Sequence, residues 1–131
     1  MNQARLTDVP FFKTLSKKEL DLVARHADEV DVQEGKVLAK QGDLGDTFFV
    51  IESGAAEVTR DGAHVADLGP GDFFGEIALL EADRRNATVT ATAPSELIVM
   101  TRASFRSIDK AMPDLHRTVQ QAIAQRRAAT A

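Results

Sequence analysis

The stretch from Gly69 to Ala91 holds residues whose types and spacing are suited to binding an anion. It reads GPGDFFGEIALLEADRRNATVTA. Its glycines and Pro70 interrupt regular structure, and glycine also lets the backbone approach a ligand closely. Residues 76–80 favour a short helix, and the first N–H groups of a helix have no partner within it, so they can bind an anion. Arg85 follows and adds a cationic donor.

Arg85 and Glu76 favour two different groups on one ligand. A guanidinium binds a phosphate through two parallel hydrogen bonds. An ionised carboxylate only accepts hydrogen bonds, so Glu76 needs a hydroxyl donor, which the 2′-OH of a ribose supplies. The alternative is structural, because a Glu that begins a helix also suits the helix dipole and an Arg-Arg pair is often a solvated surface.

The order and spacing of these residues resemble the phosphate-binding cassette of the cyclic nucleotide-binding domain family. The family pattern runs F-G-E-[LI]-A-L, a short loop, then R-x-A-[TS]-V. This chain matches it at Phe74, Gly75, Glu76, Ile77, Ala78, Leu79, Arg85, Ala87, Thr88 and Val89. The resemblance implies that Glu76 binds the ribose 2′-OH and that Arg85 binds the cyclic phosphate.

The chain departs from the family pattern at two positions. Arg84 stands where many members have Pro, and Asn86 stands where they usually have Ala, Ser or Thr. In the family a Thr directly after the arginine tends to favour the guanine nucleotide. Asn86 is neither that Thr nor the usual Ala, so the sequence leaves both cAMP and cGMP open.

The same likeness implies that Val58 and Leu68 line the pocket for the sugar and the base, although apolar strand residues are often plain core. The residues expected to bind the ligand are Phe74, Gly75, Glu76, Ile77, Ala78, Arg85, Asn86, Ala87, Thr88, Val58 and Leu68.

Composition predicts one soluble domain without a disulfide or a Cys-based zinc site. The chain has 131 residues, 44% of them hydrophobic, and 16 basic against 20 acidic side chains give a net charge of −4. A net negative chain is a poor non-specific binder of nucleic acid. The absence of Cys excludes disulfides and a thiol nucleophile. No signal peptide and no membrane-spanning apolar run are found, so we expect a cytoplasmic protein.

The middle of the chain predicts short β-strands. Apolar and alternating segments at residues 30–32, 37–39, 48–51, 56–59 and 64–68 are separated by glycine-containing turns, among them Asp61-Gly62, a type I′ hairpin signal. This spacing is typical of an all-β sandwich or barrel. The family resemblance implies an eight-stranded, jelly-roll-like β-roll with an N-terminal helix and two C-terminal helices.

The expected division of the chain follows from these signals. Residues 1–28 form an N-terminal helical segment, residues 29–101 the β-roll with its cassette at 69–91, and residues 102–131 the hinge and lid helices. Ser16 and Glu19 make a capping box that opens a helix running to Ala27. We expect Phe11 and Phe12 to pack on the body of the domain.

The last strand is expected at Leu97–Met100, buried on both faces, followed by a helix that Thr101 caps. Pro113 then breaks that helix and suits the start of a second, short amphipathic one. Its apolar face carries Leu115, Val119, Ala122 and Ile123, and its polar face Gln120, Gln121, Gln125, Arg126 and Arg127. This helix could cover the ligand and signal to a protein effector, pair with a second copy, or simply close the β core.

A cupin-like β-barrel enzyme is the first rival interpretation, and it needs a metal. The three histidines, His26, His64 and His116, lack metal-binding spacing and are each expected at the surface. No nucleophile elbow or Walker loop occurs either. We therefore expect no cofactor besides the nucleotide ligand, and no enzyme activity.

The second rival is the N-terminal sensor fragment of a Crp/Fnr-type transcription regulator, the catabolite activator type. Such proteins carry a helix-turn-helix after the long helix, and this sequence stops at Ala131 without one. An initiator Met and a small-residue C-terminus favour a stand-alone ligand sensor.

Overall fold

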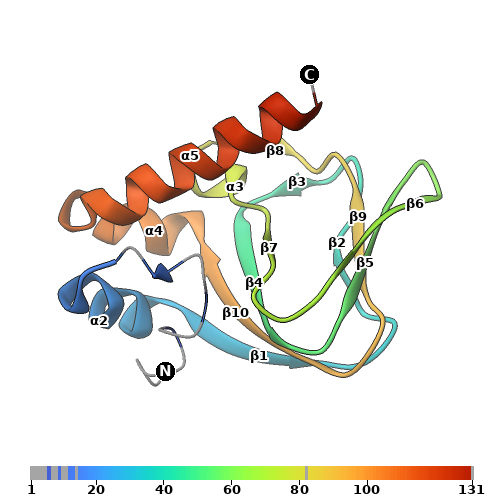
Figure 1. Cartoon of the computed structure of the whole chain (residues 1–131), viewed down its shortest axis with the longest axis horizontal. Helices are drawn as coiled ribbons and strands as arrows, with labels where there is room; N and C mark the ends of the chain where they lie inside the picture. Colours follow the sequence, from blue (N-terminus) through green and yellow to red (C-terminus); the bar gives the residue numbers. More distant parts are fainter. Residues whose placement is uncertain (1–5, 7–8, 10–11, 14, 82, 131) are drawn as a thin grey trace.

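The computed structural model describes residues 6, 9, 12–13, 15–81 and 83–130, with side chains described as far as Gln125 except that of Asp83. Within these residues, eight strands form two four-stranded antiparallel sheets that face each other as a roll (Figure 1). The mainly β fold class predicted from the sequence is confirmed.

The first sheet has the order β1-β10-β4-β7 and the second β2-β9-β5-β6. Their strands are β1 (Asp28–Val32), β2 (Val37–Ala39), β4 (Thr47–Ser53), β5 (Ala56–Arg60), β6 (Ala63–Leu68), β7 (Phe73–Phe74), β9 (Thr88–Ala91) and β10 (Ser95–Thr101). A further short pair joins β3 (Leu44–Gly45) to β8 (Asp83–Arg84). This pair attaches the cassette loop to the loop that precedes β4.

The helices are α2 (Lys17–His26), α3 (Ile77–Leu80), α4 (Arg102–Ile108), the 3-10 turn η2 (Asp109–Ala111) and α5 (Pro113–Thr130). Figure 1 shows α2, α4 and α5 gathered on one side of the roll. The predicted caps are present, because Ser16 Oγ accepts the Glu19 N–H at 3.2 Å and Thr101 Oγ1 accepts the Ser104 N–H at 3.1 Å. Helix α2 ends at His26, and Ala27 is extended as its C-cap.

The β5–β6 hairpin turns as its sequence predicts. Asp61 and Gly62 have φ angles of 54° and 81°, and a type I′ turn needs positive φ at both central residues. Gln41 braces this tip, since its side chain both accepts the Asp61 N–H and donates to the Asp61 carboxylate, at 2.9 Å each. The hairpin is therefore held to the loop between β2 and β3.

Two groups of buried side chains fill the interior. The smaller group lies inside the roll and includes Ile51, Phe74 and Leu97. The larger joins the helices to the first sheet, and in it Leu115 and Val119 of α5 are buried beside Val23 of α2. Phe12 belongs to this second group, whereas the predicted packing of Phe11 lies outside the described residues.

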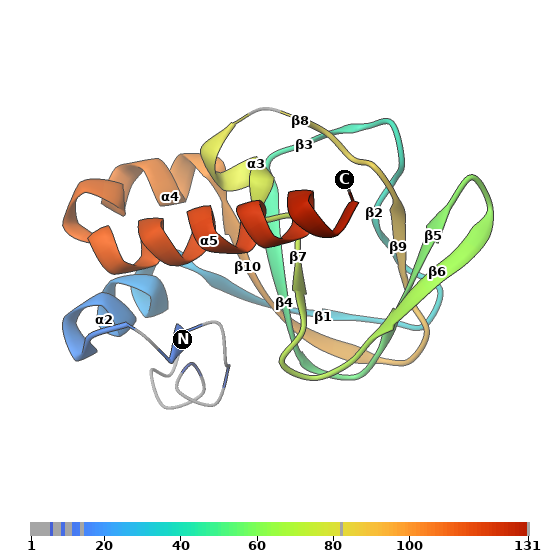
Figure 2. The same cartoon turned by 45° about the horizontal axis from the view of Figure 1, so that its top comes forward.

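Helix α5 is longer than the short helix that the sequence suggested, with 18 residues. Figures 1 and 2 show it starting beside α4 and running past α3. Its predicted apolar residues are buried against the helices and the first sheet: Leu115, Val119, Ala122 and Ile123. The N-terminal part of α5 is thus a component of the core. Arg126 and Arg127, predicted on its polar face, have no described side chains.

Among the described residues, no helix combines the length and the apolar character needed to cross a membrane.

Candidate functional site

A cavity of about 510 Å³ lies between the cassette and the inner face of the second sheet. The sheet contributes apolar side chains and one arginine: Ala39, Val58, Arg60, Val65, Ala66, Leu68 and Val89. The cassette contributes Phe74, Gly75, Glu76, Ile77, Ala78, Arg84, Arg85, Asn86 and Ala87. One wall is therefore apolar and the other carries most of the charge.

Arg85 is half-buried in this cavity and is held from behind. Its Nη2 donates to the carbonyl oxygen of Thr47 at 2.7 Å. Gly45 and Gly75 flank the guanidinium so closely that a Cβ at Gly45 would overlap its Nε and Cζ, and a Cβ at Gly75 would lie 2.7 Å from its Nη1. The two glycines therefore form a cradle whose shape depends on their lack of side chains.

Burial lowers the pKa of Arg85 below its ordinary value, while the carboxylates of Asp46 and Glu76 raise it. Arginine stays protonated in proteins even when it is partly desolvated. The cradle thus presents a permanent positive charge to the cavity in partly dehydrated surroundings. An anion that reaches it is bound more strongly than in bulk water, because screening is weaker there.

Glu76 precedes α3 and has a relative exposure of 2%. It lines the cavity and is close enough to Arg85 to influence its pKa. A buried carboxylate beside an arginine is an acceptor for a hydroxyl that enters the same space.

The start of α3 offers fewer open N–H groups than the sequence suggested. The helix is a single turn of four residues, in which the Ala78 N–H donates to the Gly75 carbonyl at 3.1 Å and the Leu79 N–H to the Glu76 carbonyl at 3.2 Å. The prediction of free N–H groups along this turn is therefore wrong for Ala78 and Leu79, because a tight turn closes its own hydrogen bonds.

Of the side chains predicted to bind the ligand, all of them described here, only Thr88 lies off the cavity lining. Its Oγ1 accepts the Gln41 N–H at 3.0 Å and so braces the loop after β2. Arg84 lies on the lining, and its Nη1 donates to the Gly42 carbonyl at 2.8 Å.

The sequence interpretation did not include several lining residues: Ala39, Arg60, Val65, Ala66, Arg84 and Val89. Alternation along β5 could have identified Arg60. Side chains two positions apart on a strand share a face, so Arg60 lies on the same side as Val58. Simple alternation along the sequence does not predict Val65 on the cavity lining, because the register of the β5–β6 ladder shifts between Val58 and Thr59.

The three histidines are not all surface residues as predicted. His116 of α5 is half-buried, stacks on Phe105 at a centroid distance of 6.2 Å and bonds Asp109 through Nδ1 at 2.7 Å. His64 is exposed beside Glu57 and Asp67. The hydrogen bond to Glu57 raises the pKa of His64. This surface cluster lies outside the cavity lining.

Comparisons with known proteins find relatives of this chain. The family model described as "Cyclic nucleotide-binding domain" matches residues 29–111. A cAMP-dependent protein kinase regulatory subunit of Yarrowia lipolytica is 40% identical over 97 residues, which is 74% of this chain and 26% of that protein. The chain therefore spans about a quarter of the length of this curated relative.

Solved structures give the same likeness. The Catabolite Activator Protein of Thermus thermophilus has a TM-score of 0.82 at 29% identity, covering 92% of this chain and 59% of that one. The regulatory domain of Toxoplasma gondii PKA, crystallised with cAMP, has a TM-score of 0.82 at 26% identity, covering 97% of this chain and 48% of that one.

Proposed function

Because the chain belongs to the cyclic nucleotide-binding domain family, we propose that its cavity binds a 3′,5′-cyclic nucleotide, cAMP or cGMP, as the input of a regulatory sensor. One observation carries the proposal. The glycine cradle places the Arg85 guanidinium in a cavity that also contains the buried carboxylate of Glu76.

Each part of the ligand has a partner of matching chemistry. The cyclic phosphate carries one negative charge and binds the Arg85 guanidinium. The ribose 2′-OH donates to Glu76. The base and the sugar ring lie against Val58 and Leu68 on the apolar wall. The remaining predicted cassette residues line the cavity without an assigned partner, and the ligand contact of Thr88 stays a prediction.

The role of Glu76 is testable with a nucleotide that lacks the hydroxyl. A hydrogen bond to a charged acceptor contributes about 1.5–3 kcal/mol, so the 2′-deoxy cyclic nucleotide should bind roughly one to two decades more weakly than its parent. In Glu76→Ala this difference should disappear when both ligands are titrated by calorimetry. Additive losses from the two changes would show that Glu76 contacts another group. If the wild type binds neither cAMP nor cGMP, the proposed function is overturned.

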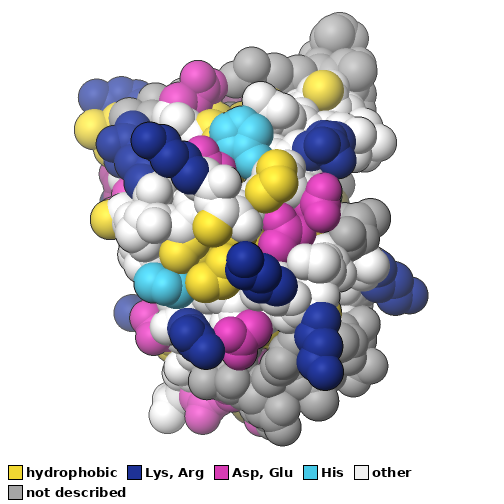
Figure 3. Space-filling view, turned by 90° about the vertical axis from the view of Figure 1, so that its left-hand side faces the viewer, with side chains coloured by type: hydrophobic (Ala, Val, Ile, Leu, Met, Phe, Trp, Pro, Cys, Tyr) yellow, Lys and Arg dark blue, Asp and Glu magenta, His cyan; other side chains and the backbone are white. Residues whose placement is uncertain are grey.

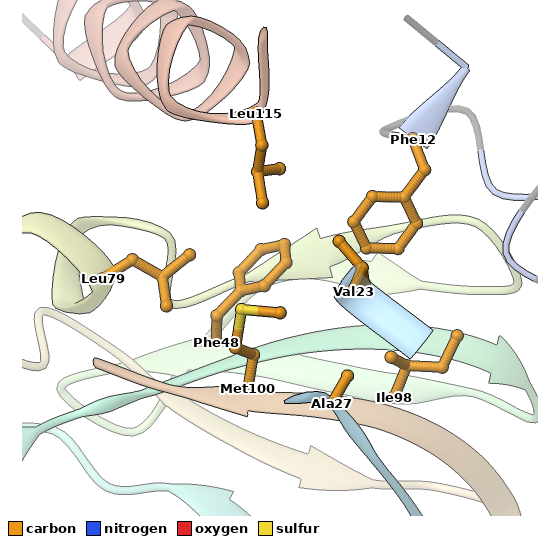
Figure 4. A pocket seen from close by; sticks show the side chains of 8 residues that line it. All are labelled: Phe12, Val23, Ala27, Phe48, Leu79, Ile98, Met100 and Leu115. Carbon is orange, nitrogen blue, oxygen red and sulfur yellow. The ribbon is translucent and has the colours of Figure 1, made fainter. Parts of the chain in front are cut away.

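We propose that α5 reads out ligand occupancy through the packing of α3. Leu79 of α3 and Leu115 of α5 both point toward Phe48, from different directions, around a cavity of about 10 Å³ lined only by apolar side chains (Figure 4). An apolar space of this size does not hold an ordered water molecule. Because the side chains around it are closely packed, a displacement of one side chain also displaces its neighbour. A ligand that moves the cassette therefore changes the support of α5.

The lid function that the sequence suggested for residues 102–131 belongs to the same proposal. Among α5 side chains described up to Gln125, none lines the cavity. A lid would thus require α5 to shift toward the ligand, and Met112 between η2 and α5 is the natural hinge. The partner that detects the position of α5 is a protein effector or a second copy of the chain.

The charge distribution supports a regulatory domain that does not itself contact nucleic acid. Figure 3 shows Lys and Arg side chains interspersed with Asp and Glu on the face where α2 and α4 lie. Two exposed ion pairs are Arg25–Asp21 on α2 and Arg117–Asp114 on α5, at 2.9 and 3.2 Å. A nucleic-acid surface needs a patch of one sign. The likeness to the Catabolite Activator Protein supports, as a second candidate, the sensor portion of a transcription regulator.

A further inference from the structure

Arg60 is a third arginine in the cavity, and the functions proposed above leave it without a ligand group. It ends β5, and its Nε donates to the carbonyl oxygen of Asn86 at 3.0 Å. Among the described residues, this is its one hydrogen bond or ion pair. The Arg60 side chain is exposed, and its terminal Nη1 and Nη2 groups are therefore available as donors. The Nε bond holds the guanidinium beside Asn86 at the mouth of the cavity.

The position of Arg60 relative to the base follows from the rest of the lining. With the phosphate on Arg85 and the ribose on Glu76, the base is left with the apolar wall of Val58, Val65 and Leu68. Arg60 lies two residues beyond Val58 on the same face of β5, so it stands at the edge of that wall. A flat base on the wall presents its edge to Arg60.

The other arginine without a ligand group is placed differently. Arg84 lies on β8, which pairs with β3 rather than with β5, and its Nη1 is bonded to the Gly42 carbonyl. It contributes positive charge to the cavity from the cassette side, away from the apolar wall.

A guanidinium distinguishes the two purines. Guanine presents two neighbouring acceptors, O6 and N7, which match two N–H groups of one arginine. Adenine presents the N7 acceptor beside the N6 amino donor, so one of the two N–H groups would face another donor. We propose that Arg60 is the residue that selects the base and that it favours guanine, an inference that rests on the proposed cyclic nucleotide function.

The test is calorimetric titration of the wild type, Arg60→Lys and Arg60→Leu with cGMP, cAMP and cyclic inosine monophosphate. The wild type should bind cGMP about 5- to 150-fold more tightly than cAMP, the range for one bidentate pair. Cyclic inosine monophosphate keeps O6 and N7 but lacks the 2-amino group, so it should retain most of that advantage. In both variants the cGMP:cAMP ratio should fall to within about threefold, because lysine lacks the paired donors.

Arg84→Leu is the matched control, since it removes the same charge from the same cavity. Arg84→Leu should weaken the binding of cGMP and of cAMP by the same factor and leave the ratio of their affinities unchanged. A ratio that persists in Arg60→Lys and Arg60→Leu overturns the inference, as does a wild type that prefers cAMP or binds cyclic inosine monophosphate no better than cAMP. These outcomes leave the proposed function intact. Failure of the wild type to bind any of the three nucleotides overturns both.

Discussion

At the scale of single residues, two glycines control the site by lacking side chains. Gly45 is close to Nε and Cζ of Arg85, and Gly75 is close both to Nη1 of Arg85 and to the Thr47 carbonyl that accepts from Nη2. The backbone therefore contacts most of the guanidinium directly. This arrangement fixes the direction of the charge without a second side chain and leaves the open side to the ligand.

Arg85→Leu should weaken cyclic nucleotide binding by about 3–5 kcal/mol, the range for breaking a buried charge pair. This corresponds to roughly two to four decades in Kd, measured by calorimetry. Arg84→Leu is the control and should have a much smaller effect, because the Arg84 side chain is exposed and bonds the Gly42 carbonyl. Equal affinities of the wild type and Arg85→Leu would show that Arg85 does not bind the phosphate.

Gly75→Ala should displace Arg85 and weaken binding in the same assay. The φ of Gly75 is +83°, and the new Cβ would lie 2.6 Å from the Thr47 carbonyl oxygen and 2.7 Å from Nη1 of Arg85. Backbone strain alone costs about 1–3 kcal/mol of folding stability, so the control must carry the same strain.

Gly35→Ala supplies that control for Gly75→Ala. Its φ is +91°, and a Cβ there meets nothing within 4 Å. Both variants should unfold at lower denaturant concentration, but only Gly75→Ala should lose affinity, by roughly tenfold or more. Equal affinities of the two variants would contradict the cradle.

At the scale of elements, α5 contributes to the hydrophobic core in addition to its proposed role as a lid. Leu115 and Val119 have exposures of 1% and 0%, so cutting the chain before Pro113 would expose the helical core. Removal of α5 is therefore a poor test of the lid, because it would also remove core packing. The coupling of α5 to the ligand is better measured in the full chain.

Amide hydrogen exchange should slow in residues 113–125 when a saturating cyclic nucleotide is added, because occupancy stabilises the docked state of α5. The central strands β4 and β10 serve as an internal control, since they are already protected and should change little. If exchange in α5 is indifferent to ligand while that of residues 75–80 slows, α5 is a packing element and the proposed relay fails.

A buried carboxylate joins α2 to the start of α5. Glu19 has an exposure of 4%, and its Oε1 accepts the Asp114 N–H at 3.2 Å. Burial raises the pKa of Glu19 above its ordinary value of 4.5, and the neighbouring Asp114 carboxylate raises it further. An acid with a raised folded-state pKa contributes stability that is full below the unfolded-state pKa and is lost as pH rises through the folded-state pKa.

Glu19→Gln should therefore be more stable than the wild type at pH 7, by on the order of 1 kcal/mol. Glutamine keeps an acceptor for the Asp114 N–H, and its amide can donate to the Asp114 carboxylate. Denaturant midpoints should converge as the pH is lowered toward 4.5, where the wild-type carboxyl also becomes protonated. A variant that is less stable at pH 7, by an amount that pH does not change, would contradict this.

At the scale of the whole molecule, the roll separates the candidate binding cavity from the helices. The cavity lies against the second sheet, and the helices pack on the first. Helix α3 is the part of the cassette that reaches across this division, because it packs against α4 and α5. The lining of the cavity and the packing of the helices therefore meet at the cassette.

The sequence by itself determined the features that depend on neighbours along the chain. The Ser16 and Thr101 caps, the Asp61-Gly62 turn and the alternating strands follow from local backbone preferences, and all are present. The spacing from Glu76 to Arg85 also placed both residues on one cavity, because the intervening loop is short.

Only the tertiary structure decided which side chains from distant segments meet. Arg60 reaches the cavity because β5 pairs with β9, and its partner Asn86 is 26 residues away in sequence. Thr88 lies off the lining, and its Oγ1 accepts the N–H of Gln41, 47 residues away. The burial of His116 and of the α5 stripe likewise depends on α4 and α2 packing beside it. Local propensity has no information on such contacts, since long-range packing selects them after the elements form.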